Sequence, residues 1–579
     1  MATLDWIVLG IFFGLLIGIV WWVLRQKEET SVDYFLAGRN AGWFVIGASI
    51  FASNIGSEHL VGLAGAGAES GMAMAHWEMH AWIILILGWL FVPFYSRSMV
   101  YTMPEFLEKR YNAGSRTVLS LISLVSYVLT KVAVTVWAGG TVFKTVFEIE
   151  YIEFLGYQVD FFWVGAIGLV IITGLYTIFG GMKSVLYTSA LQTPVLLIGS
   201  IVILVVGLNQ LGGWSELESI MRAQPTGYGN DSMMNLIRSP KDPQFPWTGV
   251  ILGSAIIGFW YWCTDQYIVQ RTLSAANIGQ ARRGTIFAGY LKLLPVFIFL
   301  VPGMIAFALN QQGMLNLEQP DDAFPLLVAE LLPVGVKGLI VGGITAALMS
   351  SLGALFNSSA TLFTVDFYKK FRPETPEKKL VYIGRVATAV IVVLGILWIP
   401  VMESIGDFLY VYLQDIQSLL APGIATVFLL GVFWKGTTAK AGFWGLLVGF
   451  FLGMFRLLFR VINNVFVIPA KINGTAALEW TQEKAANPAG LNWFETFTVK
   501  FMSLNWLHYE ILLFFFCILL VVIISRFTEK PTAEKLQGLT FGSVSKEQKA
   551  ETRSSISKWD IINTVIIVSI VIAFYAYFW

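Results

Sequence analysis

Long apolar stretches separated by polar loops dominate the chain. A helix needs about 20 predominantly apolar residues to cross the hydrocarbon core of a bilayer, and by that rule the sequence predicts about 14 spans. The predicted spans are 5–24, 41–66, 73–97, 118–146, 161–180, 184–209, 247–268, 285–308, 337–365, 380–400, 404–433, 438–460, 508–526 and 558–578. The pattern predicts an all-α polytopic membrane protein that forms one membrane domain over residues 1–579.

The basic residues fall in alternate gaps between these spans. Gaps 147–160 and 309–327 contain no Lys or Arg, whereas 98–117 and the stretch from Arg526 to Lys558 are basic. The positive-inside rule places the basic gaps in the cytoplasm. An even number of spans requires both termini to lie on the same side of the membrane, and the loop charges place that side outside the cytoplasm. We therefore predict a protein of the cell (inner or plasma) membrane with both termini extracytoplasmic.

Composition supports the membrane assignment and excludes several classes. Hydrophobic residues make up 56% of the chain and charged residues only 13%, about half the charged share of soluble domains. A net charge of +1 gives no reason to expect nucleic acid as a partner. The two cysteines, Cys263 and Cys517, lie inside apolar segments, so a disulfide framework is not expected. The first apolar stretch lacks a basic n-region and a cleavage site, and we interpret it as a retained helix.

Two spans contain runs that an uninterrupted helix would avoid. Residues 52–59 mix Gly and small polar residues with an acid, and residues 258–266 combine Gly, aromatic and polar side chains. These are the second and seventh spans, which hold matching positions in two five-helix halves. Interrupted helices at matching positions are typical of inverted-repeat transporters with a midplane site. The alternative is that the small polar residues only pack helices together.

An unwound segment frees carbonyl oxygens that suit a hard cation. Ala347, Ser350 and Ser351 share one helix face because they are spaced i, i+3 and i+4. Together with the carbonyls of Ala52 and Ile55 they could supply five neutral oxygens to a singly charged ion. Alternatively, the two serines only bond back to their own helix.

Polar and aromatic residues in the apolar spans suggest a site for a polyhydroxylated solute. The candidates are His59, Glu78, Lys292, Gln414 and the cluster Trp260, Tyr261 and Trp262. Amide, imidazole and charged groups exchange hydrogen bonds with hydroxyls, and aromatic rings stack on the CH face of a pyranose. For Glu78 and Lys292 the alternative is a buried structural ion pair.

No motif indicates an enzyme or an ATP-driven pump. None of the four histidines lies in an HExxH pattern, and GxxxxGK[ST] does not occur. Uphill transport would have to draw its energy from an ion gradient.

Several long runs resemble the sodium/glucose cotransporter family, within the sodium:solute symporters. They are residues 47–71, 88–111, 260–275, 290–306, 348–368 and 421–435. The resemblance extends in order from about residue 30 to 450 and weakens in the last three spans. It implies a LeuT-type core of 5+5 helices in inverted repeat, with one helix before it and three after. The implied divisions are 5–24 (leading helix), 41–209 (first repeat), 247–433 (second repeat) and 438–579 (trailing helices with the outer loop 461–507).

The resemblance also implies roles for individual residues. The sodium positions are Ala52, Ile55, Ala347, Ser350 and Ser351. The sugar-contacting positions are His59, Glu78, Tyr261, Trp262, Lys292 and Gln414, with Asn54 in the same unwound stretch and Gln417 one turn beyond Gln414. The gates are Leu63, Trp77 and Tyr410 on the outer side and Tyr261 on the inner side.

The chain departs from the family at two positions. Relatives that bind a second sodium carry an Asp where this chain has Ser189, and a hydroxyl where it has Gly353. Losing both oxygen donors predicts one sodium per sugar.

The hypothesis from sequence is therefore a sodium-coupled symporter that imports a glucose- or galactose-like hexose by alternating access. One alternative is a sodium symporter for another polar solute, such as inositol or sialic acid. The other is a sugar sensor that transports little, against which the amide of Gln414 argues. Asp415 has no partner that the sequence identifies.

Overall fold

The computed structural model describes the whole chain apart from residues 1, 27–29, 57, 148, 155, 228–229, 404–408, 470–471 and 473. The described part is almost entirely helical, with one short antiparallel hairpin formed by β1 (Tyr151–Phe154) and β2 (Tyr157–Asp160). The predicted start of the eleventh span, residues 404–408, lies outside the described residues.

Every predicted span coincides with helix, although many spans are built from several pieces. In chain order the pieces are α1 (Thr3–Leu24); α3 (Trp43–Asn54), η2 (Glu58–Leu63) and α4 (Ala64–Ser70); α5 (Ala75–Glu78), α6 (Ala81–Ile86), η4 (Leu87–Phe91) and α7 (Val92–Ser98); α9 (Ala113–Ser126), η5 (Tyr127–Val132) and α10 (Ala133–Phe147); α11 (Phe161–Leu211); α13 (Trp247–Phe259), η6 (Trp260–Thr264) and α14 (Gln266–Leu273); α15 (Ile278–Lys292), η7 (Val296–Leu300) and α16 (Val301–Gln311); α18 (Val336–Thr361), η9 (Leu362–Tyr368) and α19 (Lys369–Phe371); α20 (Glu377–Glu403); α21 (Leu409–Phe433); α22 (Ala439–Ile462) and η10 (Asn463–Val467); α25 (Trp506–Phe527); and α28 (Lys558–Tyr577).

Shorter elements connect them: α2 (Ser31–Leu36), η1 (Ala37–Arg39), η3 (Gly71–Met74), α8 (Met103–Arg110), α12 (Trp214–Arg222), η8 (Pro320–Asp322), α17 (Ala323–Leu331), α23 (Gly474–Ala486), α24 (Trp493–Met502), α26 (Ala533–Leu536), η11 (Phe541–Ser543) and α27 (Lys546–Ser554). The predicted outer loop 461–507 therefore contains two helices of its own, α23 and α24, and the gap between the predicted spans that end at 209 and begin at 247 contains α12.

Counted as continuous helical segments, nine in the described part of the chain are long and apolar enough to cross a membrane. This number is smaller than the roughly 14 predicted spans partly because segments that are continuous in helix can contain two spans. Helix α11 holds two of them, and Gly181 interrupts it with a non-helical backbone (φ 50°, ψ −151°) between the predicted ends at 180 and 184. A side chain there would collide with the Tyr34 carbonyl oxygen, 2.6 Å from its Cβ, so only glycine fits.

Both interruptions predicted from the sequence are present. Helix α3 ends at Asn54, and Ile55 has an extended backbone (φ −81°, ψ 103°). Asp265 likewise adopts an extended conformation between η6 and α14, and its carboxylate accepts a hydrogen bond from the Tyr267 N–H at 3.2 Å. The freed carbonyl of Ser53 accepts hydrogen bonds from the hydroxyls of Tyr267 and Ser351. Side chains from distant spans thus satisfy the broken backbone, as a membrane interior requires.

Helix α18 lies at the centre of the bundle and is the most buried of the long apolar segments. It packs against α11, α1 and α20. Small residues bring other helices close together: a Cβ on Gly303 of α16 would lie 1.8 Å from the Ala64 carbonyl oxygen of α4. Such contacts are typical of helix packing in membranes, where small side chains let backbones approach.

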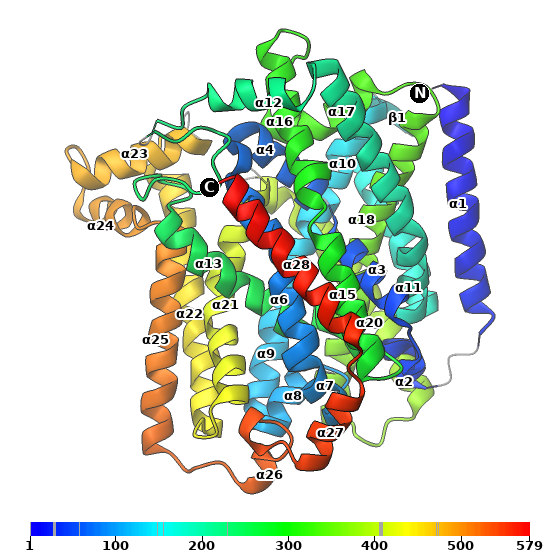
Figure 1. Ribbon diagram of the computed structural model, residues 1–579, viewed down its shortest axis with the longest axis vertical. Helices are drawn as coiled ribbons and strands as arrows, with labels where there is room; N and C mark the ends of the chain where they lie inside the picture. Colours follow the sequence, from blue (N-terminus) through cyan, green and yellow to red (C-terminus); the bar gives the residue numbers. More distant parts are fainter. Residues whose placement is uncertain are drawn as a thin grey trace.

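The two termini lie toward the same end of the molecule (Figure 1). That end also carries the hairpin, α12, α17, α23 and α24, whereas α2, α8, α26 and α27 lie toward the opposite end (Figure 1). The C-terminus is fixed there by hydrogen bonds from the Leu236 N–H to the Phe578 carbonyl and from Asn235 to the Trp579 carbonyl. The arrangement is consistent with an even number of crossings.

Candidate functional site

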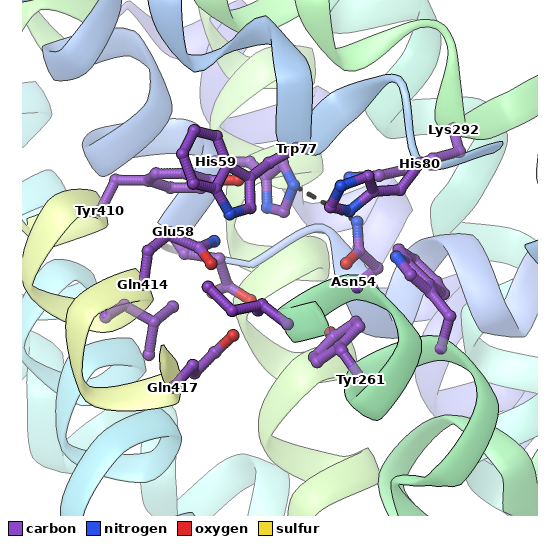
Figure 2. Close-up of a pocket in the computed structure, with 14 residues that line it drawn as sticks. Asn54, Glu58, His59, Trp77, His80, Tyr261, Lys292, Tyr410, Gln414 and Gln417 are labelled. Carbon is purple, nitrogen blue, oxygen red and sulfur yellow. Dashed lines mark hydrogen bonds between the residues drawn. The ribbon is translucent and has the colours of Figure 1, made fainter. Parts of the chain in front are cut away.

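A buried pocket lies where the two interrupted spans meet α15 and α21 (Figure 2). Residues from five parts of the chain line it: Asn54, Glu58 and His59; Trp77 and His80; Ile257, Gly258, Tyr261 and Trp262; Lys292; and Tyr410, Leu413, Gln414 and Gln417. Figure 2 shows Tyr410, Gln414 and Gln417 on one helix, α21, with Asn54 and Tyr261 across the pocket from them. The ends of broken helices and the facing helix α21 therefore converge on one cavity.

An ionic and hydrogen-bonded network forms one wall of the pocket. Lys292 Nζ donates to Glu78 Oε2 at 2.5 Å, and the Tyr410 hydroxyl donates to Glu78 Oε1 at 2.8 Å. His59 Nε2 lies 3.3 Å from Glu78 Oε1 and also 3.3 Å from the Asn54 side-chain nitrogen. Glu78 is fully buried and lies behind Lys292 and Tyr410 rather than on the cavity surface. The ion pair weighed as a structural alternative is present, and its lysine also faces the cavity.

Four buried polar atoms of the pocket residues have no hydrogen-bond partner within the described part of the chain. They are His59 Nδ1, Trp77 Nε1, His80 Nε2 and Gln414 Oε1. A buried polar atom without a partner costs free energy, and native proteins rarely leave several of them together. A ligand or water molecules that both donate and accept hydrogen bonds would satisfy all four.

Aromatic rings form the side of the pocket near η6. The rings of Tyr261 and Trp262 lie edge to face with centroids 4.9 Å apart, and Lys292 Nζ lies 5.3 Å from the Trp262 ring. Trp260, predicted with them, does not line the cavity. Its ring lies 6.0 Å from Lys131 Nζ instead, because successive residues of a helical turn point in different directions.

Lys131 lies behind these rings and forms a second buried ion pair. Its Nζ is 2.9 Å from Asp265 Oδ2, and the Tyr127 hydroxyl also donates to Asp265. The same ammonium lies 4.3 Å from the Tyr261 ring and 4.1 Å from the Tyr267 ring. The network therefore ties Tyr261, the predicted inner gate, to the break in the seventh span.

The predicted outer gate is only partly on the cavity surface. Trp77 and Tyr410 line the pocket, whereas Leu63 is fully buried and does not. Trp77 stacks on Trp506 of α25 with ring centroids 5.9 Å apart. Trp506 lies in a part of the chain where the family resemblance weakens, so its contribution was not predicted.

Of the predicted sodium residues, the structure brings Ser351 of α18 into contact with Ile55. Ser351 Oγ donates toward the carbonyl oxygens of Ser53 and Ile55, at 3.0 and 3.2 Å, and Ala347 lies one turn earlier on the same helix. Ser350 instead pairs with Ser189, with their hydroxyl oxygens 2.7 Å apart. Ala52 is buried in the last turn of α3. The set consists of hydroxyls and carbonyls, which suit a hard monovalent ion.

Five lining residues were not predicted as site residues: Glu58, His80, Ile257, Gly258 and Leu413. Glu58 and His80 carry a detectable signal, since ionisable groups inside apolar spans are functional candidates. Ile257, Gly258 and Leu413 carry no such signal. The unassigned Asp415 forms an ion pair with Arg460 of α22, a partner that only tertiary contact identifies.

The cavity is small, with a volume of about 30 Å³. One water molecule needs about 10–15 Å³ on this measure, so the pocket has room for a few waters and not for a hexose. The side chains must separate before a solute of that size can bind.

Comparison with known proteins agrees with this architecture. Residues 34–449 match the model of the sodium:solute symporter family. The chain is 36% identical over 561 residues to sodium/myo-inositol cotransporter 2 of Oryctolagus cuniculus, covering 92% of this chain and 78% of the relative. It is also 36% identical over 561 residues to sodium/glucose cotransporter 1 of the same organism, covering 91% and 79%.

A solved structure of a Na⁺-coupled sialic acid symporter in a substrate-bound, outward-open state has the same fold. The TM-score is 0.68 at 18% identity, over 92% of this chain and 99% of that one. This similarity confirms the predicted all-α membrane fold of LeuT type. Because the family model covers most of the chain and relatives match nearly all of it, the chain belongs to the sodium:solute symporter family and is a multi-pass, sodium-coupled solute transporter, not an enzyme.

Proposed function

We propose that this transporter imports a hexose of the glucose or galactose type together with sodium, by alternating access. The observation that carries the proposal is the convergence, on one buried pocket, of polar atoms without a hydrogen-bond partner among the described residues, of the Lys292 ammonium and of aromatic rings. A pyranose presents hydroxyls that donate and accept hydrogen bonds and an apolar face that stacks on rings. His59, Asn54 and Gln414 supply the polar contacts, and Tyr261 and Trp262 supply the rings.

Myo-inositol is the second candidate. It is favoured by the similarity to sodium/myo-inositol cotransporter 2, which equals the similarity to sodium/glucose cotransporter 1. Its ring of hydroxyls would meet the same polar atoms.

A carboxylated sugar such as sialic acid fits less well. The described lining of the pocket includes no arginine, and its lysine, Lys292, already binds Glu78 at 2.5 Å. Binding a carboxylate would require Lys292 to leave Glu78 or to share its charge between two anions.

The coupling between ion and solute would arise because one backbone segment, the break after α3, contributes to both the predicted sodium site and the solute pocket. The break after α3 supplies the Ile55 carbonyl to Ser351, and the same segment carries Asn54 and His59 into the pocket. A sodium ion held by α18 and this break would fix the position of the two pocket residues. The solute would then meet an ordered site only when sodium is bound, which is positive cooperativity by preorganisation.

We further propose one sodium per solute. Ser189 pairs with Ser350, and the space beside Gly353 is filled by Tyr176, whose hydroxyl would lie 2.6 Å from a Cβ at that position. A hydroxyl-bearing side chain at residue 353 would therefore displace Tyr176. The sodium dependence of uptake should have a Hill coefficient near one, and a value near two would contradict the proposal.

The direct experiment is uptake by the purified protein in sealed liposomes with an imposed sodium gradient. Radiolabelled glucose, galactose, myo-inositol and sialic acid are compared, with potassium replacing sodium as the control. We expect sodium-dependent accumulation of a hexose. Accumulation of myo-inositol alone would select the second candidate, and sodium-dependent binding without accumulation would indicate a sensor.

A further inference from the structure

Glu58 lies between the predicted sodium site and the solute pocket. It is the first residue of η2, three positions after Ile55, and its side chain is buried with 9% exposure. A Cβ added to Gly56 would lie 2.5 Å from Glu58 Oε2 and 2.6 Å from Ser351 Oγ. The carboxylate and the Ser351 hydroxyl therefore flank the same small space beside the broken backbone.

The same side chain also faces the pocket. Glu58 lines the cavity together with Asn54, His59 and Gln414, and Figure 2 shows it beside Gln414. One carboxyl group is thus adjacent to the hydroxyl expected to bind sodium and to the residues expected to bind the solute.

We propose that Glu58 is a positioning and coupling residue that adds a negative charge to the sodium site and links its occupancy to the solute pocket. The inference rests on the proposed function, in which Ser351 and Ile55 bind the coupling ion. The predicted sodium site consists of neutral oxygens alone, and a nearby carboxylate raises its attraction for a cation. Even at an effective dielectric constant of about 20, a unit charge several ångströms away changes cation affinity by more than about tenfold.

Two buried lysines near Glu58 do not cancel the attraction of its carboxylate for a sodium ion. Lys131 and Lys292 both interact electrostatically with Glu58. Each ammonium, however, is hydrogen-bonded to a different carboxylate, Lys131 to Asp265 and Lys292 to Glu78. Their charges are therefore partly balanced where they lie.

The space at Gly56 explains how the carboxylate reaches the site. Any side chain at residue 56 would overlap both Glu58 Oε2 and Ser351 Oγ. Glycine at this position leaves the two oxygens able to approach a common ion.

The test compares Glu58→Gln with the unchanged protein and with Glu69→Gln, which makes the same substitution at the end of α4. Purified protein in detergent is titrated with sodium chloride at constant ionic strength, and sodium-dependent thermal stabilisation is recorded. Uptake in liposomes gives the half-saturating sodium concentration and the solute KM at saturating sodium. Glu58→Ser serves as a second neutral variant if the glutamine variant does not fold.

We expect either neutral variant at residue 58 to raise the half-saturating sodium concentration about tenfold in both assays. At saturating sodium the solute KM should change less than threefold, and Glu69→Gln should match the unchanged protein. An unaltered sodium titration in a folded neutral variant would overturn the inference, as would a rise in solute KM alone. If the unchanged protein shows no response to sodium, the proposed function itself fails, which is a distinguishable result.

Discussion

Gln414 is the pocket side chain whose proposed contact with the solute is most directly testable. Its Oε1 is buried on the pocket and has no hydrogen-bond partner within the described residues, so a bound hydroxyl would be its first. Gln414→Ala should therefore weaken binding by about 1–3 kcal/mol, the usual cost of leaving a buried hydroxyl without its hydrogen-bond partner. Measured by uptake in liposomes, the KM for the solute should rise roughly 5- to 150-fold. Gln311→Ala, an exposed amide at the end of α16, is the control and should leave KM unchanged.

Ser351 should act on sodium rather than on the solute. Its hydroxyl contacts the carbonyls of Ser53 and Ile55, so Ser351→Ala removes one oxygen from a site of few ligands. We expect the half-saturating sodium concentration to rise about tenfold, since losing one hydrogen-bonding group costs about 1 kcal/mol or more. Ser359→Ala, two turns further along α18, is the matched control. Equal effects of the two serine variants would argue against the sodium assignment.

At the scale of elements, the leading helix anchors α18. Asp5 of α1 accepts hydrogen bonds from the backbone N–H groups of Gly335 and Gly338, at 2.7 and 2.9 Å. These are donors at the start of α18 that the helix itself cannot satisfy. Asp5→Ala should lower the free energy of unfolding by about 1–2 kcal/mol, measured by thermal unfolding in detergent. Asp5→Asn, which keeps an acceptor oxygen, should recover part of that loss.

The contact between α4 and α16 depends on the absence of a side chain. A Cβ on Gly303 would lie 1.8 Å from a carbonyl oxygen of α4, a backbone atom that cannot turn aside. Gly303→Ala should destabilise the protein by about 3 kcal/mol or more, since overpacking forces backbone shifts. Gly10→Ala on α1, where nothing lies within 4 Å, should be neutral or slightly stabilising. Thermal unfolding of both variants in the same detergent decides between these outcomes.

For the whole molecule, the distribution of basic residues predicts which end faces the cytoplasm. The end that carries both termini (Figure 1) includes gaps 147–160 and 309–327, which lack Lys and Arg. Single cysteines at Ala2 and Trp579 should therefore react with an impermeant maleimide in intact cells. Lys109→Cys should react only after permeabilisation. The natural cysteines, Cys263 and Cys517, are buried and give a low background. Labelling of Lys109→Cys in intact cells would reverse the assigned orientation.

The sequence predicted most of the fold and much of the site. Apolar length and loop charge predicted the spans, and Gly and polar residues marked the breaks at residues 55 and 265. The π-helical turns in other spans, such as η5 and η7, were not predicted. Such turns occur as single bulges inside otherwise α-helical segments, so the apolar length that predicted the spans carries no sign of them.

The site residues likewise fall into those that the sequence predicted and those that it did not. Seven of the predicted solute residues line the cavity: Asn54, His59, Tyr261, Trp262, Lys292, Gln414 and Gln417. Trp260 does not reach it, Glu78 lies behind it, and His80 joins it without having been predicted. Which way a side chain points depends on the local turn and on the helix opposite, and neither is encoded at a single position.

The sequence by itself determined that this chain crosses a membrane repeatedly, where its helices break, and which residue types lie at the breaks. These features follow from local physics, since apolar length and unsatisfied backbone groups act within one segment. Only the tertiary structure decided that Glu58 lies near Ser351, that Asp415 pairs with Arg460, and that the cavity has a volume of about 30 Å³. Each of these depends on the packing of spans far apart in the chain, which no single segment specifies.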